Sequence, residues 1–492
     1  MAHNVRKLGK PTAFMNDRLL HVYHRLPGPL RSLGASMRGA RLRTWRYSRD
    51  TERLAGEAIE RERWSPEQWK IWQDNRLSFL LHRAATRVPY YRRLWSERRR
   101  RGDRSSWEQL ENWPILEKES LRANAPAFVA DDCDRRRMSH EHTSGTTGKP
   151  IDLWQSQQAA RAWYALFEAR SRIWYGVSRR DRWAILGGQM ISPVSQRRPP
   201  FWVWNAALSQ LYMSSYHLAP DLVPHYLNAL RRYRIVYLLG YTSALYALAQ
   251  EVLRLKRNDL KLAVVITNAE PVFDYQREVI SQAFQCPVRD TYGMSEIAFA
   301  ASECDAATLH IWPEVGVAEV MQDDQPQAEG EVGDLICTGL LNADMPLIRY
   351  RLGDRGMLPA LQEPCQCGRI LPRMGSIEGR ADDVLYTVDG RRIGRLDPVF
   401  KSHLGIREAQ IIQETLGSVR LRFVPAPEYT PEDGRTMVKR IQQRMGDVAV
   451  VLDSVSEIQR TSNGKFRSVV CNLSAEHLIQ LRDLPPNSGV KQ

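Results

Sequence analysis

A regular alternation of strand-like and helix-like segments between residues 235 and 290 limits the folds that this chain can adopt. Two segments have helical spacing, from about Thr242 to Leu255 and from about Tyr275 to Phe284. Three short apolar runs flank them, at Ile235–Leu239, Ala263–Thr267 and Pro287–Arg289. Strands that alternate with helices in this way pair in parallel, because each helix returns the chain to the same end of the sheet. We therefore expect a parallel sheet here.

Polar residues directly follow two of these apolar runs. The second run is followed by Asn268, Ala269, Glu270 and Pro271, and the third by the segment Asp290–Glu296. Open parallel sheets bind their ligands beyond the carboxyl ends of their strands, where these two clusters would lie close together. The sequence therefore predicts a ligand site between them.

Residues 142–150 combine two glycines, four hydroxyl side chains and a lysine with almost no apolar residue. The glycines are Gly145 and Gly148, and the other candidate donors are Thr143, Ser144, Thr146, Thr147 and Lys149. Glycines let backbone N–H groups approach a ligand closely, and the polar side chains add donors, as an oligophosphate requires. The common P-loop is excluded, because only two residues separate the glycines and a proline follows the lysine. We interpret the segment as a phosphate cradle of a different fold.

The segments on either side of the parallel region have helical and antiparallel patterns. The pattern over residues 50–125 predicts several helices. One of these helices starts with Ser65 as N-cap and Pro66 at the first helical position. A further helix is predicted after Ser156, with an apolar face at Ala160, Trp163, Tyr164, Phe167 and Ile173. Short strands with frequent glycines predict a distorted barrel or antiparallel sheet over residues 316–358.

Beyond about residue 380 the pattern is that of a small α+β domain. Strands are predicted at Ala409–Gln413, Val419–Val424 and Ala449–Leu452, and a helix begins after Thr430 at Pro431 and ends at Gly446. We expect a helical lead-in over residues 1–130, the remainder of the N-terminal domain over 131–381 and a small C-terminal lid domain over 382–492. The predicted fold class is α/β, with helix-flanked, mostly parallel sheets, a β-barrel-like part and a mobile α+β C-terminal domain.

Composition and charge limit the classes of function that this chain can have. With 492 residues, of which 43% are hydrophobic, the chain can bury a large core. The net charge of +14 is concentrated in arginine runs such as Arg98–Arg101 and Arg135–Arg137. These runs lack the aromatic interleaving and the motif spacing of nucleic-acid-binding proteins, so we expect solvated helix faces and no nucleic-acid partner.

We expect neither an export signal nor a membrane-inserted segment in this chain. No apolar run approaches the length of a membrane span, and the basic segment from Met1 to Arg25 lacks the apolar core of a secretory signal. Seven cysteines, an odd number, favour the reducing cytoplasm over a disulfide framework. The N-terminal segment has apolar residues at Leu19, Leu20, Val22, Tyr23 and Leu26. Their amphipathic pattern fits a peripheral membrane contact or a cap on the core, and we favour the cap.

Five short motifs resemble, in order and spacing, those of the adenylate-forming (acyl-CoA synthetase, ANL) superfamily. They are Thr143–Pro150, Tyr292–Glu296, Tyr350–Asp354, Gly379–Asp383 and Asn463–Lys465. Two more motifs, Val88–Tyr91 and Cys365–Arg369, narrow the resemblance to the phenylacetate-CoA ligase-like branch with its CapK-like capsule-biosynthesis members. The resemblance covers nearly the whole chain.

The resemblance implies a two-step reaction that consumes a carboxylic acid and ATP. The carboxylate attacks the α-phosphate of ATP to give an acyl-adenylate and pyrophosphate, and a thiol, usually coenzyme A, then displaces AMP. Attack of one anion on another needs neutralised phosphate charge and aligned reactants. Backbone N–H groups, Mg²⁺ and a positioned cation would meet that need.

Several nucleotide contacts are implied by the resemblance. The cradle from Thr143 to Lys149 would hold the β- and γ-phosphates, and Glu296 would help to hold Mg²⁺. Tyr292, followed by Gly293 and Ser295 in its motif, would stack on adenine, and Ala269, Glu270 and Pro271 would pass along the edge of the base. Asp354 would accept hydrogen bonds from the ribose hydroxyls, with Arg380 nearby. Ser295 stands where the family usually has threonine, which keeps the hydroxyl group.

Two residues of the C-terminal part have special roles by resemblance. Lys465 would be catalytic, because its ammonium group would bridge the carboxylate substrate and the transferred phosphate. Asp382 would mark the hinge about which the small domain swings between adenylation and thiol transfer. Lys465 follows the expected glycine, Gly464, but the proline that is common upstream in the superfamily is absent.

A second group of residues suggests a metal site. Cys304 and His310 lie near each other in the sequence, and Cys365 and Cys367 follow in a turn. Three thiolates and an imidazole would form a closed, structural zinc site, because no position would remain open for water. The alternative is a set of buried free cysteines with a surface histidine, since neither pair has the usual Cys-x2-Cys spacing.

The sequence thus predicts an acid–thiol ligase that makes an acyl- or aryl-CoA through an acyl-adenylate. One alternative is adenylation for transfer to a carrier protein or another nucleophile in polysaccharide or secondary-metabolite biosynthesis. Another is a non-catalytic binding protein, which the intact Glu296, Asp354 and Lys465 argue against. The acid is expected between the helix after Ser156 and the ends of the parallel strands. Aromatic residues suited to an apolar or aromatic acid are Trp163, Phe167, Tyr241 and Tyr292.

Overall fold

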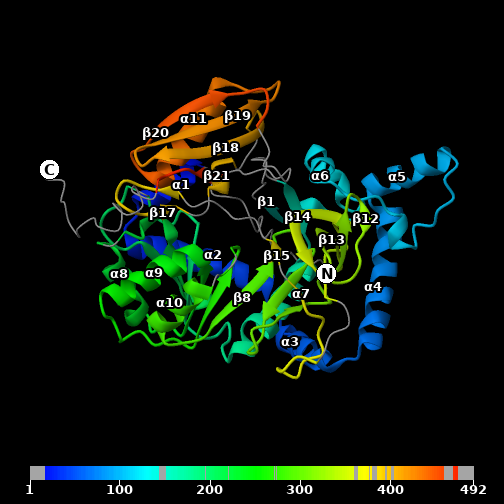
Figure 1. The fold of residues 1–492 in the computed structure, drawn as a ribbon, viewed down its shortest axis with the longest axis horizontal. Helices are drawn as coiled ribbons and strands as arrows, with labels where there is room; N and C mark the ends of the chain where they lie inside the picture. The colour runs from blue at the N-terminus through cyan, green and yellow to red at the C-terminus, as the bar shows by residue number, and fades with distance from the viewer. Residues whose placement is uncertain are drawn as a thin grey trace, which may run out of the picture.

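The computed structural model describes residues 17–142, 151–193, 195–219, 221–270, 272, 274–359, 364–375, 377–378, 385–393, 396–400, 404–458 and 469–474. Two large sheets and a small C-terminal domain make up most of this part of the chain (Figure 1). The predicted fold class, α/β with mostly parallel sheets and a separate C-terminal α+β part, is confirmed.

The larger sheet has eight strands in the order β10-β9-β8-β7-β6-β3-β5-β4. Their bounds are β3 Trp183–Gly187, β4 Trp202–Asn205, β5 Gln210–Ser214, β6 Tyr237–Tyr241, β7 Val264–Asn268, β8 Val288–Gly293, β9 Ala300–Glu303 and β10 Leu309–Ile311. The five central strands, from β5 to β8, run parallel, as predicted for β6, β7 and β8. The sequence patterns did not predict β3, β4 and β5, which extend this sheet toward its other edge.

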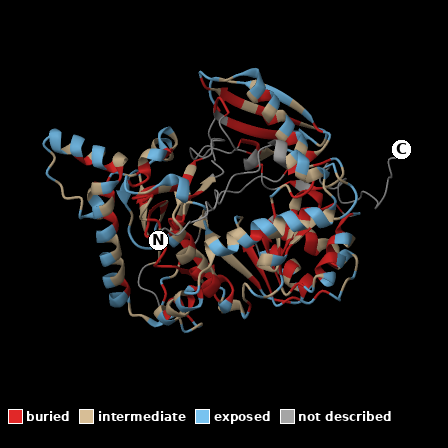
Figure 2. Ribbon diagram, turned by 180° about the vertical axis from the view of Figure 1, so that it is seen from behind, coloured by how far each residue is buried: buried red, intermediate tan, exposed pale blue. Residues whose placement is uncertain are grey.

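Three helices pack against one face of this sheet. They are α8 Val223–Arg232, α9 Thr242–Arg254 and α10 Asp274–Phe284. Their apolar residues, such as Leu227, Leu248 and Ile280, form one fully buried cluster with Leu186 and Val265 of the strands. Burial of this apolar surface fixes the strand ends that carry the predicted ligand site. In Figure 2 the strands are mostly buried, while the outer sides of the helices are exposed.

The second sheet is antiparallel, as one of the two predicted alternatives for this region. It has the order β12-β11-β13-β14-β15, and its strands are β11 Gly316–Gln322, β12 Gln325–Pro326, β13 Val332–Gly339, β14 Tyr350–Met357 and β15 Ile377–Glu378. Strands β1 Ser139–His142 and β2 Asp152–Gln155 form a separate antiparallel hairpin. Tyr350, at the start of β14, is fully buried in the core that this sheet shares with the N-terminal helices.

The N-terminal part is helical, as expected. Its helices are α1 Asp17–Arg25, α2 Gly28–Arg46, α3 Thr51–Glu60, α4 Pro66–Arg87, α5 Pro89–Arg100 and α6 Lys118–Ala123. Ser65 caps α4 through a capping box with Gln68, and Pro66 occupies the first turn, as predicted. Single-turn 3-10 helices are η1 Arg61–Arg63, η2 Leu110–Asn112, η3 Ala125–Phe128, η4 Arg135–Arg137, η5 Ile173–Tyr175, η6 Ala206–Leu208, η7 Ser215–His217 and η8 Asp397–Phe400. None of the described helices is long and apolar enough to cross a membrane.

Helix α7, Gln157–Ser171, follows Ser156, whose side chain accepts a hydrogen bond from the Ala159 amide as predicted. Its end differs from the prediction, because Ile173 lies beyond the helix and is 42% exposed. The buried face of α7 also carries charges that the apolar pattern did not indicate. Arg170 donates two hydrogen bonds to the Glu314 carboxylate, at 2.6 and 2.8 Å, so the two buried charges are paired.

The C-terminal sheet has the order β20-β19-β18-β21, with β18 Ile406–Thr415, β19 Ser418–Pro425, β20 Ala449–Ser454 and β21 Val469–Cys471. Helix α11, Pro431–Met445, begins after Thr430 and ends at Gly446, as predicted. A hairpin of β16 Leu385–Tyr386 and β17 Arg392–Ile393 precedes them. Arg391 in this hairpin donates a 2.6 Å hydrogen bond to the carbonyl of Tyr216, which joins the C-terminal part to η7.

Candidate nucleotide site and cysteine–histidine cluster

Tyr292 and Asp354 meet at the border of the two large sheets. Tyr292 lies near the carboxyl end of β8, and its hydroxyl donates a 2.7 Å hydrogen bond to Oδ2 of Asp354 on β14. Both side chains are half-buried, so a ligand can still reach them. The two residues that the motifs predicted for adenine and ribose binding are thus direct neighbours.

Glu296 and Ser295 follow β8 in the same loop. Oε1 of Glu296 accepts a 3.2 Å hydrogen bond from the hydroxyl of Tyr350, and the carbonyl of Ser295 accepts one from the side-chain amide of Gln155 at the end of β2. The loop is therefore attached to both β14 and the β1–β2 hairpin. Glu296 is half-buried, and its role as a metal ligand stays a prediction.

The backbone is strained at two positions beside the predicted ligand contacts. Ala269, one residue beyond β7, has φ 64°, and Ile297, directly after Glu296, has φ 51°. A β-branched residue such as isoleucine is rarely found with a positive φ, and residues in such conformations cluster at functional sites. Ile297 is only 4% exposed, so packing holds the strained backbone in place. The motifs gave no indication of this feature.

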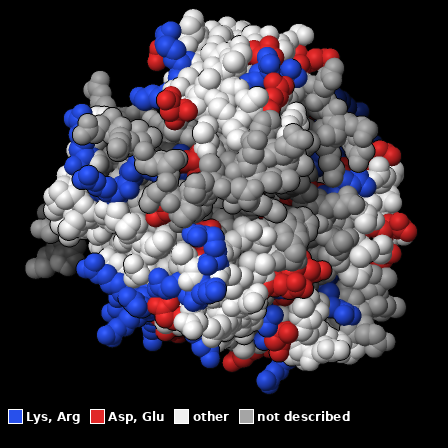
Figure 3. Space-filling model, turned by 60° about the vertical axis from the view of Figure 1, so that its left-hand side comes forward, with Lys and Arg blue, Asp and Glu red and all other residues white. Residues whose placement is uncertain are grey.

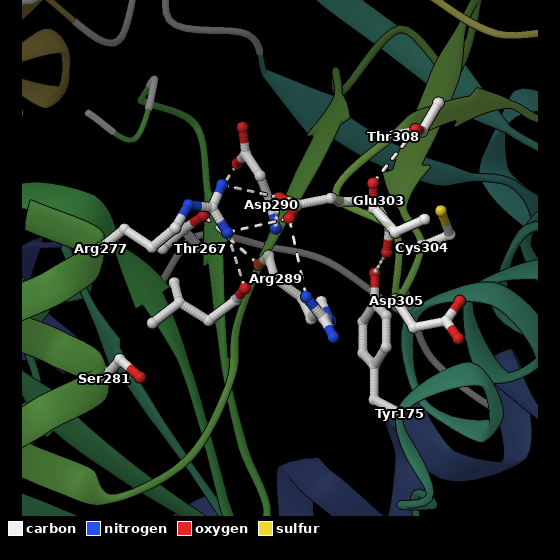
Figure 4. A network of polar contacts seen from close by, with 12 residues as sticks. Tyr175, Thr267, Arg277, Ser281, Arg289, Asp290, Glu303, Cys304, Asp305 and Thr308 are labelled. Carbon is white, nitrogen blue, oxygen red and sulfur yellow. Dashed lines mark hydrogen bonds and ion pairs between the residues drawn. The ribbon is translucent and has the colours of Figure 1, made fainter. Parts of the chain in front are cut away.

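A network of polar contacts fixes the relative positions of the ends of β7 and β8 (Figure 4). Asp290 accepts a 2.8 Å hydrogen bond from the Thr267 hydroxyl, and its amide donates to Glu303 of β9. Arg277 of α10 forms two hydrogen bonds with the buried Glu303 carboxylate, at 2.9 and 2.8 Å. Burial raises the pKa of Asp290 to about 6; the hydrogen bond from Thr267 opposes this shift, and the Glu303 charge adds to it.

At the end of β7, a hydrogen bond holds the backbone and one buried side-chain oxygen has no described partner. The Thr242 hydroxyl donates a 3.0 Å hydrogen bond to the carbonyl of Glu270. Oδ1 of Asn268 is buried and has no hydrogen-bond partner among the described residues. Asn268, Ala269 and Glu270 thus lie at the carboxyl end of β7, whereas Pro271 lies outside the described residues.

Two of the aromatic residues predicted to line the acid site, Trp163 and Phe167, pack against one core cluster. A ring atom of Trp163 lies 3.5 Å from the position that a Cβ would take on Gly293, so Trp163 borders the Tyr292 loop. Trp163 also packs on Trp312, with ring centroids 5.4 Å apart. Phe167 packs against the same core cluster as Trp163, and its ring centroid lies 4.8 Å from the guanidinium carbon of Arg172.

Other predicted residues lie outside the part of the chain that the structure describes. They are Thr143, Ser144, Gly145, Thr146, Thr147, Gly148 and Lys149 of the cradle, together with Arg380, Asp382 and Lys465. The strands on either side of the cradle are described and pair with each other, with His142 opposite Asp152. His140 accepts or donates a 2.8 Å hydrogen bond with Asp152 and stacks on Trp154 at 4.6 Å. The base of the cradle is thus a fixed hairpin.

Four possible metal ligands lie close together in the structure: Cys304, His310, Cys365 and Cys367. In the sequence, the first two of them are far from the last two. The ligand atoms of all four lie within 4.8 Å of one another. The sulfur atoms of Cys304 and Cys365 are 3.8 Å apart, and the Cys367 sulfur is 3.3 Å from Nε2 of His310. Three thiols and one imidazole at such distances fit a tetrahedral zinc ion with no open position. All seven cysteines are free, so no disulfide competes for these sulfur atoms.

The groups around this cluster suit a metal site. Nδ1 of His310 lies 3.0 Å from the carbonyl of Leu371, an acceptor that holds the proton on Nδ1 and leaves Nε2 free for a metal. Burial lowers the pKa of His310, which favours the neutral imidazole that ligates metals. Arg369 lies over the Trp174 ring at 4.2 Å and donates a hydrogen bond to Glu62, so the turn after Cys367 is attached to the helical region.

Comparisons with known proteins agree with these motifs. The family model of the CapK C-terminal domain matches residues 385–472. Protein CapK of Staphylococcus aureus is 25% identical over 473 residues, which cover 92% of this chain and 100% of that protein. Phenylacetate-coenzyme A ligase of Thermus thermophilus is 28% identical over 344 residues, or 65% of this chain and 72% of that enzyme. The corresponding ligase of Pseudomonas putida is 28% identical over 336 residues, or 64% and 71%.

Solved structures give the same fold. A 2-hydroxyisobutyryl-CoA ligase in complex with 2-HIB-AMP and CoA, in its thioesterification state, aligns with a TM-score of 0.54 at 20% identity. The alignment covers 86% of this chain and 94% of that one. At this identity the likeness is evidence of the fold alone. In sequence, the chain is similar to CapK over most of its length and to the phenylacetate-coenzyme A ligases over about two thirds of it, and its C-terminal part matches the CapK C-terminal domain.

Proposed function

We propose that this protein activates a carboxylic acid with ATP and transfers the acyl group to coenzyme A. The observation that carries the proposal is the contact between Tyr292 and Asp354, which joins two motifs of a nucleotide site across two sheets. Relatives that are named phenylacetate-coenzyme A ligases align with about two thirds of the chain and support the same chemistry.

The reaction has two displacement steps. A carboxylate oxygen attacks the α-phosphorus of ATP, the bond to the bridging oxygen of pyrophosphate breaks, and an acyl-adenylate forms. The sulfur of the CoA thiolate then attacks the acyl carbonyl carbon, and AMP leaves with the electron pair of the broken C–O bond. Each step needs an electrophile that is held in line with its nucleophile, and the rigid strand ends at β7 and β8 supply such a frame.

The residues around these strand ends have distinct roles in this proposal. The half-buried Asp354 carboxylate accepts hydrogen bonds from the ribose hydroxyls, and Tyr292 holds the adenine against its ring. Glu296 supplies a hard oxygen ligand for Mg²⁺, which would neutralise phosphate charge when bound. Asn268 is the only one of these groups whose buried oxygen has no partner among the described residues, so we expect a donor from a ligand there.

The remaining roles follow from the motifs. The cradle from Thr143 to Lys149 binds the β- and γ-phosphates, Arg380 lies near the ribose, and Lys465 is the catalytic cation. Asp382 is the hinge of a lid that comprises residues 382–492, while residues 1–130 and 131–381 form the N-terminal domain. We propose an apolar or aromatic acid as substrate, because Trp163 borders the Tyr292 loop.

We also propose a structural zinc ion at Cys304, His310, Cys365 and Cys367. Its function would be to attach the turn that carries Cys365 and Cys367 to the strands β9 and β10, because the four ligands come from both segments. The ion would take no part in acyl transfer, since the four protein ligands fill its coordination sphere.

Product analysis tests the proposed reaction. The protein is incubated with ATP, Mg²⁺, CoA and a panel of aromatic and aliphatic acids, and AMP and acyl-CoA are measured by mass spectrometry. We expect at least one acid to give AMP and thioester in equal amounts. Formation of AMP without thioester would contradict CoA as the acceptor, and no acid-dependent AMP with any acid would contradict the proposal as a whole.

A further inference from the structure

One side of helix α2 covers an edge of the large sheet. The serines Ser32 and Ser36 hydrogen-bond the backbone amide and carbonyl of Trp204 on β4, at 3.2 and 3.3 Å, and β4 is an edge strand. Gly39 lies so close to the sheet that an added Cβ would be 1.9 Å from the Asn205 side chain. This side of α2 therefore satisfies polar groups of an edge that would otherwise be open.

The opposite side of α2 presents apolar side chains to solvent. Leu30, Leu33 and Met37 are 47%, 57% and 70% exposed, and their spacing places them on one face of the helix. We call these three residues, together with Arg38, the α2 outer face. Four of the eleven large apolar side chains that are exposed in the described structure lie between residues 22 and 37, so the exposure is concentrated here. Figure 2 is turned so that α2 runs across the near side of the molecule.

The charges around the α2 outer face have a single sign. Residues 18–49 contain eight arginines and no aspartate or glutamate. Arg25, Arg38 and Arg43 are exposed, and none of them forms an ion pair with a described carboxylate. By contrast, the exposed Arg180 pairs with Glu52, as many surface arginines of this protein do. Figure 3 shows such mixed basic and acidic clusters on another view of the surface.

We propose that the α2 outer face docks on an anionic phospholipid bilayer. A helix with apolar residues on its outer face and unpaired arginines beside them can lie flat in the headgroup region, where the apolar groups enter the acyl boundary and the guanidinium groups meet lipid phosphates. This role is separate from the proposed ligase reaction. A nucleic acid would bind the arginines through its phosphates but would leave Leu33 and Met37 exposed to water. A bilayer would contact both the arginines and the apolar side chains, so we favour the bilayer as the partner.

Sedimentation of the full chain with vesicles tests this proposal. We expect the protein to sediment with phosphatidylcholine vesicles that contain phosphatidylglycerol, to remain in solution with phosphatidylcholine alone, and to be released by salt. The variant Leu33→Gln/Met37→Gln should bind about tenfold more weakly, because two apolar side chains no longer enter the bilayer. The variant Arg38→Gln should bind about fivefold more weakly, because one guanidinium group no longer meets the lipid phosphates.

Matched control variants distinguish binding through the α2 outer face from nonspecific adsorption of the protein to vesicles. Ile71→Gln removes an apolar side chain that is 63% exposed on α4, and Arg93→Gln/Arg100→Gln removes two exposed charges on α5. Both control variants should bind vesicles like the native chain. Equal losses in the controls, or no sedimentation with anionic vesicles at low salt, would overturn the proposal. A native dimer that Leu33→Gln/Met37→Gln makes monomeric, without vesicle binding, would assign the face to a second copy and also overturn it.

Discussion

The hydroxyl of Tyr292 on β8 donates a 2.7 Å hydrogen bond to the carboxylate of Asp354 on β14, across the border of two sheets. The bond fixes the orientation of the Tyr292 ring, and it places an acceptor-rich carboxylate beside the ring. A nucleoside needs both groups, a flat apolar surface for the base and acceptors for the ribose hydroxyls. This pair is therefore the main structural support for an ATP-dependent activity.

Substitution of Tyr292 by phenylalanine should weaken ATP binding without abolishing the reaction. The ring remains, but the hydrogen bond to a charged group is lost, and such bonds contribute roughly 1.5–3 kcal/mol. We expect the KM for ATP to rise about tenfold with little change in kcat. Steady-state kinetics with ATP as the varied substrate measures this effect.

A matched tyrosine gives the control for that substitution. Tyr175 also donates its hydroxyl, at 2.8 Å, but to a backbone carbonyl, that of Glu303. Tyr175→Phe should lower the melting temperature and leave the KM for ATP unchanged. If Tyr175→Phe and Tyr292→Phe raised KM equally, the assignment of Tyr292 to the nucleotide would be wrong.

Two glycines of α2 should respond to alanine in opposite directions. At Gly39 the new methyl group would overlap with the Asn205 side chain, so Gly39→Ala should destabilise the fold by about 1–3 kcal/mol. At Gly34 the space is open, so Gly34→Ala should stabilise it by about 0.5–1 kcal/mol through helix propensity. Denaturant unfolding of both variants measures the difference. Stabilisation by both would contradict the close packing of α2 on β4.

Asp290 should make stability depend on pH between about 4 and 6. Its pKa is raised from 3.8 to about 6 by burial, so the native state keeps a proton in this range that the unfolded chain has lost. Stability from this group is therefore present at low pH and lost as pH rises through the window. Asp290→Asn cannot titrate, so its melting temperature relative to the native chain should increase from pH 4 to pH 6 and then level off.

An exposed carboxylate on α4 serves as the control for this measurement. Asp74 forms a surface pair with Lys70, and Asp74→Asn should show no such increase over the same pH range. A difference between Asp290→Asn and the native chain that stays constant or falls with pH would mean that Asp290 is not buried as described.

The cysteine–histidine cluster should hold one zinc ion per chain. Cys365→Ser replaces a thiolate by a poor zinc ligand, so we expect loss of zinc and a lower melting temperature. Cys133→Ser changes a half-buried cysteine outside the cluster and should keep the metal. Elemental analysis of freshly purified protein measures the zinc content of each variant. Clearly less than one zinc ion per native chain would contradict the proposed zinc site.

Features that depend on local chemistry were predicted well from the sequence. Ser65, Ser156 and Thr430 cap their helices through contacts within a few residues, so the sequence contains all the information that is needed. The alternation of strands and helices from β6 to β8 is also local. Strands β3, β4 and β5 are short and are defined by pairing with distant segments, which no local pattern reveals.

The candidate site shows the same limit. The motifs named Tyr292 and Asp354, but the hydrogen bond between them depends on how two sheets meet. The positive φ angles at Ala269 and Ile297 were not predicted, because neither residue type favours such a backbone and only tertiary packing imposes it.

The exchange of pyrophosphate into ATP, without CoA, tests the central claim most directly. Adenylation is reversible, so labelled pyrophosphate should enter ATP only when a suitable carboxylic acid is present. We predict acid-dependent exchange by the native chain, strongly reduced exchange by Asp354→Ala, and none by Lys465→Ala. Exchange that persists in Lys465→Ala would contradict the catalytic assignment, and no exchange by the native chain with any aromatic or aliphatic acid would contradict the account of this protein as an adenylate-forming enzyme.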